Sequence, residues 1–386
     1  MTVAGFTSTG SKRPAALFGP EPGDAPIRMT SSRGARITDD RGREYLDYVM
    51  ALGAVTLGYG DPAVTAAAAE AAARGTVGSL PPVEEERLAA RIIEVVPWLE
   101  RIRFLKTGAE AVAAAVRLAR CATGRDRILG CGYHGWLDLS SDSPGVPEAT
   151  RALYGTIRFD DGDDARRRIR EVGDALAAVV VEPVVDGPPS VAWLRTLREE
   201  TARVGALLVF DEIKTGFRVA VGGAVERWGV VPDLAVYGKA LGNGFPIAAV
   251  GGRRGVMDLV ERTWISSTLA TEFVALAAAG AAVEQIVARR APEHLGRVGQ
   301  AFHLGLARLA ETFPNLVSGV PGIPEMCYLR FHDDAIGGAV AVAAARRGLL
   351  FKRTAYNFVS LAHGDAEIAT GLELLEAALG EVAARC

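Results

Sequence analysis

The chain is short of cysteine, lysine and long apolar runs, and the first and last of these shortages exclude whole classes of protein. Its cysteines are scattered over 386 residues and form no C-x-x-C pair, which argues against a disulfide framework or a cysteine-rich zinc site. Charges interrupt the Ala-rich stretches, so none is typical of a membrane span, and the N-terminus has no apolar core of signal-peptide length. These absences predict a cytoplasmic protein in a reducing compartment. The four cysteines are Cys121, Cys131, Cys327 and Cys386.

The overall composition is that of an ordinary globular protein. Hydrophobic residues make up 49% of the chain and charged residues 23%, and the length suits one large domain with a smaller companion. The formal net charge of −3 gives no reason to expect nucleic acid or an anionic membrane as a partner.

Turn residues and apolar runs divide the sequence into three regions. Pro and Gly crowd the first 35 residues, which predicts an extended arm, and a polar turn at Asp39–Gly42 between two apolar runs predicts a hairpin. Short apolar runs then alternate with helical stretches, which indicates an α/β domain with a mostly parallel sheet. We therefore expect an N-terminal arm and part of a small domain over 1–50, a large α/β domain over 51–262, and a small α+β domain over 263–386.

Three of the predicted strands end in an ionisable residue. "VVVEP" ends with Glu182, "LLVFDE" with Asp211 and "LAVYGK" with Lys239, at steps of 29 and 28 residues, about one βαβ unit each. Ligands of open parallel sheets bind outside the carboxyl ends of the strands. We therefore expect these side chains to converge on one crevice.

The scarcity of lysine makes Lys239 notable, because only five of the 43 basic residues are lysines. Arginine cannot give up its proton, whereas a desolvated lysine can, and it then attacks carbonyl groups. Together with a buried Asp211, which would keep a pyridine nitrogen protonated, Lys239 fits a pyridoxal phosphate (PLP) site. Glu182 by itself fits a helix cap equally well. The lysines are Lys12, Lys106, Lys214, Lys239 and Lys352.

A phosphate cradle is predicted in "IRFLKTGAEA", where the turn 107–109 lies between a strand and a helix. Free N–H groups and the helix dipole favour an anion there, although such turns begin helices in most α/β proteins. A Walker-type loop is disfavoured because no Ser or Thr follows Lys239, and no early G-x-G-x-x-G indicates a dinucleotide site. Tyr133, in a glycine-flanked turn, suits the face of a cofactor ring or ordinary core packing. His134 has no second His or Cys at ligand spacing, which argues against a metal site.

These residues resemble the class III PLP-dependent aminotransferases, most closely the glutamate-1-semialdehyde aminomutase branch. The likeness runs from "ITDDRGREYLDYV" to "NFVSLAHGDAEI" and is most specific in "LLVFDEIKTGFRVAVGGAVERWGVVPDLAVYGKALGNGFPIAAVGG". It implies the fold-type I architecture, with a smaller domain built from both chain ends, and a homodimer with shared sites. The implied reaction moves an amino group between an amino acid donor and a small carbonyl substrate. The alternatives are an aminomutase, racemase or decarboxylase outcome, or a catalytically silent binding protein on this fold.

The resemblance also implies residue roles. Lys239 is similar to the Schiff-base lysine and Asp211 to the partner of the pyridine nitrogen, while Ile213 would pack under the ring and Tyr133 over it. Thr268, in "SSTLATE", matches the threonine that reaches the phosphate of the neighbouring subunit. The remaining implied cofactor contacts are Thr107, Gly108, Ala109 and Glu182.

The sequence departs from the family pattern mainly on the substrate side. Leu52 stands where the aminomutase has a tryptophan and Ala355 where it has a glutamate, and the segment after Trp136 is shorter than the aminomutase's gating loop. Ala109 removes a hydroxyl from the phosphate turn. Cofactor chemistry is therefore implied more strongly than aminomutase specificity. The predicted substrate contacts are Arg28, Leu52, Arg353 and Asn357.

Overall fold

The computed structural model describes residues 2–385, and the chain divides into two compact units. The large unit is Pro62–Pro292, and the small unit combines the chain up to Asp61 with the chain from Glu293 onward. Both chain ends therefore build the smaller unit, as expected from the resemblance. Cys386 lies outside the described residues.

The boundaries of the units differ from those expected at residues 50 and 262. Helix α11 (Phe273–Ala288) packs against α3 (Pro62–Arg74) and α4 (Val83–Val95), so it belongs to the large unit although its Ala-rich sequence resembles the helices that follow it. Its buried face consists largely of alanine, which allows close helix packing.

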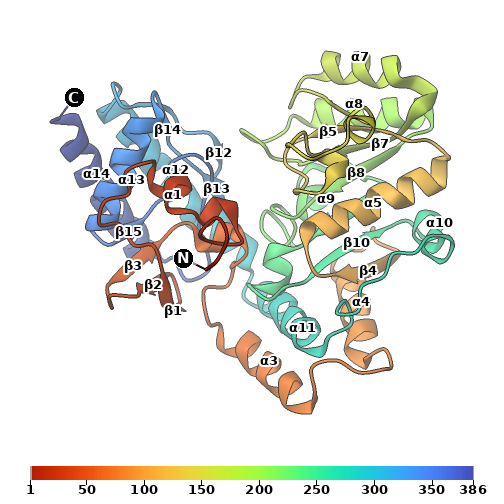
Figure 1. Cartoon of the computed structure of the whole chain (residues 1–386), viewed down its shortest axis with the longest axis horizontal. Helices are drawn as coiled ribbons and strands as arrows, with labels where there is room; N and C mark the ends of the chain where they lie inside the picture. The colour runs from red at the N-terminus through yellow and green to blue at the C-terminus, as the bar shows by residue number, and fades with distance from the viewer. Residues whose placement is uncertain (1, 386) are drawn as a thin grey trace. The chain divides into compact units, whose positions relative to one another are not determined.

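The large unit is built on a seven-stranded sheet of order β4-β10-β9-β8-β7-β5-β6 (Figure 1). Strand β10 is antiparallel to β4 and β9, whereas the remaining neighbours are parallel, which confirms a mostly parallel sheet. Strand β7 is buried at every position, as expected of a central strand covered on both faces. The strands are β4 (Arg101–Leu105), β5 (Arg127–Cys131), β6 (Tyr154–Thr156), β7 (Leu176–Val181), β8 (Leu207–Asp211), β9 (Leu234–Tyr237) and β10 (Ala248–Gly252).

Helix α5 packs across the centre of this sheet, against β7, β9 and β10. A capping box begins α5, since Glu110 and Thr107 bond each other's backbone N–H groups, and Gly124 in the left-handed conformation ends it. The apolar face of α5 is mostly alanine and valine, so the backbone lies close to the strands. The other helices of the unit are α6 (Glu148–Arg151), α7 (Gly162–Val172), α8 (Val191–Val204), α9 (Gly223–Trp228) and α10 (Arg254–Met257); α5 is Gly108–Thr123.

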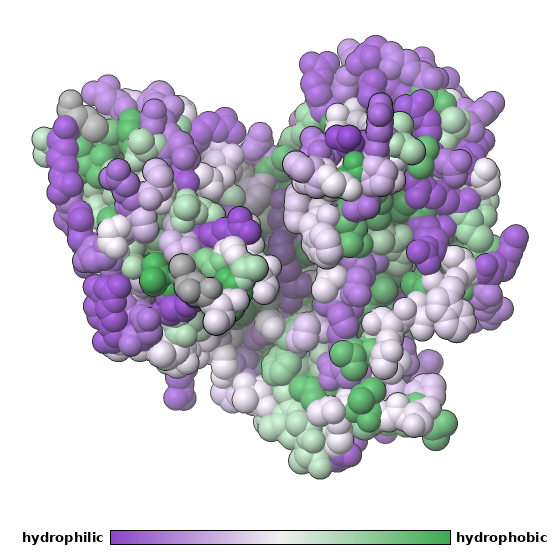
Figure 2. Space-filling model, viewed as in Figure 1, coloured by the Kyte–Doolittle hydropathy of each residue, from purple (hydrophilic) through white to green (hydrophobic). Residues whose placement is uncertain are grey.

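Charged residues dominate the outer helix α7. Figure 2 shows hydrophilic side chains over it, and of its sequence only Asp164, Ala165 and Ile169 are buried. Helix α7 packs on α8, which in turn contacts β7 and β8. The helix therefore covers the unit as a solvated outer layer.

The small unit joins the two chain ends through one sheet of order β1-β2-β3-β15. Strands β2 and β3 form the predicted hairpin, and β15 pairs with β3 in parallel. Because β15 comes from the C-terminal half, this pairing closes the unit. Its strands are β1 (Met29–Arg33), β2 (Arg36–Asp39), β3 (Glu44–Asp47), β11 (Val317–Gly319), β12 (Gly322–Ile323), β13 (Met326–Cys327), β14 (Arg330–Phe331), β15 (Leu349–Leu350) and β16 (Asn357–Phe358).

The core of the small unit lies among its three long helices and the sheet. Tyr48 stacks on Phe302 with ring centroids 4.4 Å apart, and leucines of the helices fill the space around them. The helices are α1 (Pro14–Phe18), α2 (Met50–Gly53), α12 (Ala291–Thr312), α13 (Asp334–Arg346) and α14 (Asp365–Ala383). None of the helices in residues 2–385 has both the length and the apolar character needed to cross a bilayer.

The prediction of an extended arm over the first 35 residues is wrong in part. Helix α1 packs against α13, and its Phe18 is 2% exposed in a cluster with Ala341 and Ala345. Strand β1 pairs with β2 as well. Pro14 at the first turn of α1 and the apolar residues behind it are compatible with a short helix, which tertiary packing stabilises.

Candidate active site

The carboxyl ends of three neighbouring strands form the floor of the candidate site. Asp211 is the last residue of β8, Glu182 follows β7 and Lys239 follows Gly238 after β9. The register pairs Val181 with Phe210 and Asp211 with Val236, so the strands end at nearly the same level. The structure therefore brings the three residues together, and both carboxylates act electrostatically on the lysine.

Lys239 combines an unusual backbone conformation with a perturbed side chain. It is half-buried, and its φ of 46° lies in the left-handed region, which is rarely occupied by residues other than glycine. Burial, followed by repulsion from Lys214, lowers the pKa of Lys239 to about 8, against an opposing effect of Glu182 and Asp211. A substantial fraction of the amine is therefore neutral, and nucleophilic, slightly above neutral pH.

Asp211 is held by a histidine whose role was missed at the level of the sequence. Nδ1 of His134 lies 2.8 Å from Oδ2 of Asp211, and both side chains are 1% exposed. The backbone N–H of Ile213 donates to the other carboxylate oxygen at 3.2 Å. These two donors keep the buried carboxylate oriented. The only signal in the sequence was the glycine-flanked "GYHGW", which does not specify a partner 77 residues away.

Glu182 is held by a second residue without a predicted role, Lys214. Oε1 of Glu182 lies 3.0 Å from Nζ of Lys214, and Oε2 accepts the backbone N–H of Tyr133 at 3.0 Å. Gly132 has a φ of 107°, and a Cβ there would lie 2.5 Å from Oε2 of Glu182. The tight turn therefore requires glycine, and it leaves the Tyr133 side chain 70% exposed.

The predicted phosphate turn lies directly against the residues of the floor. A Cβ at Gly108 would lie 2.6 Å from Cδ1 of Ile213, and a Cβ at Gly135 would lie 2.6 Å from the Cβ of Ala109. Thr107 caps α5, so the helix N-terminus begins at this turn. Close backbone approach together with a helix N-terminus is the arrangement that binds phosphate groups.

The other predicted contacts do not lie at the strand ends that form the floor. Thr268 is exposed in the segment 263–272, and its role depends on a second copy of the chain, so it stays a prediction. In the small unit, the guanidinium of Arg28 lies 3.8 Å from the ring centroid of Phe6, and Leu52 is half-buried with a φ of 62°.

Arg353 and Asn357 are engaged within the small unit. Arg353 forms an ion pair with Asp334 and donates to the carbonyl of Ala15 at 3.1 Å. The side chain of Asn357 bonds both the N–H and the carbonyl of Lys352, at 2.7 and 3.0 Å. Their substrate roles stay predictions, and both have a structural role as well.

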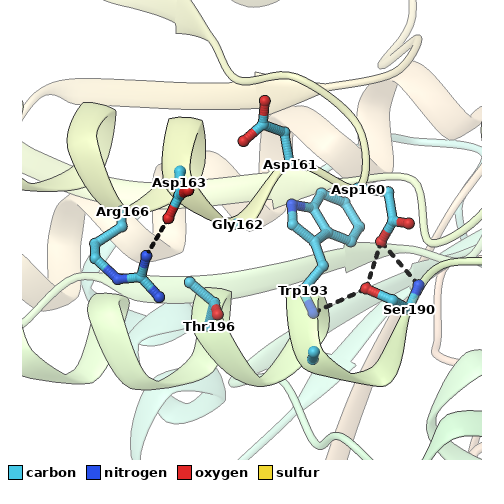
Figure 3. Close-up of a pocket in the computed structure, with 9 residues that line it drawn as sticks. Asp160, Asp161, Gly162, Asp163, Arg166, Ser190, Trp193 and Thr196 are labelled. Carbon is cyan, nitrogen blue, oxygen red and sulfur yellow. Dashed lines mark hydrogen bonds and ion pairs between the residues drawn. The ribbon is translucent and has the colours of Figure 1, made fainter.

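A separate cleft of about 430 Å³ lies in the large unit between the N-termini of α7 and α8 (Figure 3). Its polar groups bond one another: Asp160 accepts from both the backbone N–H and the hydroxyl of Ser190, and Asp163 pairs with Arg166. No predicted site residue lines it. Within residues 2–385, no three His, Cys, Asp or Glu side chains are grouped to hold a metal ion.

Comparison with known proteins shows the family of this chain. A sequence model of the aminotransferase class-III family matches residues 19–379. A glutamate-1-semialdehyde 2,1-aminomutase of Desulforapulum autotrophicum is 37% identical over 311 residues, covering 75% of this chain and 73% of the relative. One of Pyrobaculum calidifontis is 35% identical over 400 residues, covering 92% and 89%. The FumI protein of Sphingopyxis sp. MTA144, solved in its PLP internal aldimine form, has a TM-score of 0.91 and 27% identity, covering 98% and 92%.

Proposed function

This chain belongs to the class III aminotransferases and is a PLP-dependent enzyme of fold type I, and we propose that it moves an amino group from an amino acid donor to a small carbonyl substrate. The observation that carries the proposal is the Lys239 amine, whose pKa is lowered to about 8, on one floor with the carboxylate of Asp211. A lysine and an aspartate so placed supply the two groups that PLP chemistry requires.

The residues of the large unit fit the cofactor. When bound, PLP supplies an aldehyde that condenses with amines and a ring that withdraws electrons. Asp211, oriented by His134, would hold the ring nitrogen in its protonated form. The turn at Gly108 would hold the phosphate, with Ile213 packed against that turn and beneath the ring.

Lys239 has two tasks in the proposed mechanism. Its neutral amine would hold the cofactor through the aldehyde group. When it does not hold the cofactor, Nζ would take the proton from the carbon that bears the donor's amino group. A general base works best when its pKa lies near the operating pH, and a pKa of about 8 meets that condition.

Glu182 and Lys214 set the charge around this amine. The ammonium of Lys214 disfavours a second positive charge at Lys239, while Glu182 favours it and holds Lys214 in place. Burial is the main reason that part of Lys239 is unprotonated, and Lys214 adds to this effect. The exposed Tyr133, anchored to Glu182 through its backbone, would cover the other face of the ring.

An intramolecular amino-group exchange is the second candidate, because relatives 35–37% identical over most of the chain are named glutamate-1-semialdehyde 2,1-aminomutase. A homodimer, in which Thr268 completes the phosphate site of the other copy, belongs to both proposals.

Turnover with and without a carbonyl acceptor separates the two candidates. The purified holoenzyme is incubated with single amino acids, and the keto acid and amine products are quantified. Without an acceptor, a transaminase releases at most one equivalent of keto acid per active site, and repeated turnover requires the acceptor, whereas an aminomutase returns an isomer and releases no keto acid. Lys239→Ala is expected to lower turnover by on the order of 10³-fold or more. Wild-type turnover in Lys239→Ala would contradict both candidates.

A further inference from the structure

Three of the five lysines of this arginine-rich chain lie beside the candidate cofactor site. Lys239 and Lys214 belong to the floor, and the third, Lys106, directly precedes the phosphate turn and has no role so far. Its Nζ lies 2.7 Å from Oε1 of Glu272, and the two side chains are only 13% and 15% exposed. An ion pair this sheltered from water is screened much less than a surface pair.

The backbone of Lys106 is already part of the turn. Its N–H and that of Thr107 both donate to Oε2 of Glu110, at 3.1 and 2.8 Å. The side chain of Lys106 therefore extends from a backbone segment that the capping box of α5 fixes. The ion pair of Lys106 therefore begins two residues before Gly108, at a backbone position that is itself hydrogen-bonded to α5.

Glu272 is equally well anchored at the other end of the pair. Its carboxylate caps α11, since Oε2 accepts the N–H of Val274 at 2.8 Å and Oε1 accepts that of Ala275 at 2.9 Å. Oε1 thus serves the helix and Lys106 at once. The pair consequently connects the N-termini of α5 and α11. Its two residues are 166 positions apart in the sequence.

The segment before Glu272 is fixed to the same region. Arg103 of β4 donates through Nε to the carbonyl of Ile265 at 2.9 Å, and Arg117 of α5 donates to that of Trp264 at 2.7 Å. Cations of β4 and α5 therefore hold one end of the segment 263–272, and Lys106 holds the other. This segment carries Thr268, the predicted contact to the phosphate of a second copy.

We propose that Lys106 and Glu272 are positioning residues for the cofactor phosphate. The ion pair fixes the N–H groups of the turn 107–109 against α11 and aligns the segment that carries Thr268, while Glu272 neutralises the ammonium and keeps it from being a direct phosphate ligand. The inference rests on the phosphate turn assigned under the proposed function, and it is independent of which amino-transfer reaction the enzyme performs.

The test compares binding of PLP with binding of pyridoxal, which lacks the phosphate. Apoprotein of Lys106→Met and of Glu272→Gln is titrated with each compound, and the visible absorbance of the bound form is followed. PLP affinity is expected to fall about tenfold, which corresponds to 1.4 kcal/mol, whereas pyridoxal affinity changes less than about twofold. The double variant is expected to bind PLP no more weakly than the weaker single variant, because the two residues act as one pair.

Arg91→Met is the matched control. Arg91 pairs with Glu284 on the same helix α11 at 2.8 Å, but farther from its N-terminus, so its removal should leave both affinities unchanged. Melting of each apoprotein shows whether the variants fold, and Lys106→Gln serves as a second neutral variant if Lys106→Met does not.

Equal losses of PLP and pyridoxal affinity would overturn the proposal, because a general structural connection between α5 and α11 has no reason to favour the phosphorylated compound. Unchanged PLP affinity would overturn it as well. Failure of the proposed function gives a different result. The wild-type protein would then bind PLP and the variants would bind it more weakly as predicted, yet no keto acid would form with any donor and acceptor.

Discussion

The predicted cofactor residues of the large unit and the predicted substrate residues of the small unit are held in different ways. Asp211 and Lys239 stand at the ends of buried neighbouring strands, and the sheet register alone brings them together. Arg353 and Asn357 are instead bonded within their own unit: Arg353 to Asp334 of α13 and to the carbonyl of Ala15 in α1, and Asn357 to the backbone of Lys352. The meeting of residues at neighbouring strand ends can therefore be predicted from their spacing in the sequence, whereas contacts of Arg353 with two distant helices cannot.

The largest expected effect comes from the carboxylate of Asp211. Asp211→Asn keeps the shape but removes the charge that would stabilise a protonated ring nitrogen, so kcat should fall by on the order of 10³-fold. Steady-state kinetics measures the loss, and an absorbance titration shows that PLP still binds. An Asp211→Asn enzyme with a kcat within tenfold of the wild-type value would show that turnover does not depend on this charge.

A substitution of Arg353 tests the predicted substrate residues of the small unit. Arg353→Met leaves Asp334 without its cation and removes the bond to Ala15, which should lower the free energy of unfolding by about 1–3 kcal/mol. Urea denaturation measures this change. If Arg353 also binds the substrate carboxylate, KM for the donor rises at least tenfold, and an unchanged KM would restrict the residue to its structural role.

The buried His363 of the small unit predicts a loss of stability in acid. Burial lowers the pKa of His363 to about 4, against an ordinary value of 6.5, so between these values the unfolded chain binds more protons than the folded one. Its contribution to stability is therefore fully present above pH 6.5 and is lost as the pH falls toward 4, by at most about 1.4 kcal/mol per pH unit.

Urea denaturation at pH 7 and pH 5 checks this dependence. His363→Gln removes the titrating group, and the difference between the two pH values should shrink by about 1–2 kcal/mol. His332 is mostly exposed, and His332→Gln is the matched control, expected to leave the difference intact. An unchanged difference in His363→Gln would contradict the prediction.

The smallest expected effect concerns the charge next to Lys239. Burial is the main cause that lowers the pKa of this amine; among the charged groups at the end of β7 and at or after the end of β8, Lys214 and Arg218 also lower it, while Glu182 and Asp211 raise it. Lys214→Met removes one repelling cation and leaves the carboxylate of Glu182 without Lys214, so the pKa of Lys239 should rise above 8. The increase of kcat/KM with rising pH should then occur at a pH higher by about half a unit to one unit. A pH–rate profile measures the shift, and an acidic shift would contradict the assigned role of Lys214.

Much of the site could be predicted because its elements follow local rules. The turn 107–109 before a helix and the ionisable residue at the end of each of three strands each follow from a pattern of a few neighbouring residues. The bond between His134 and Asp211 and the pair between Lys106 and Glu272 escaped prediction, since each joins residues more than 70 positions apart. Long side chains can reach many partners, and only the packed chain selects one.

The sequence by itself determined the βα rhythm, the mostly parallel sheet and the identity of the amine and carboxylate at its edge, because hydrophobic periodicity and turn chemistry act over short distances. Tertiary structure alone decided which unit α11 joins, that the first residues pack as α1 against α13, and which cations surround Lys239. Those outcomes depend on burial and on contacts between distant segments, and both exist only after the chain has folded.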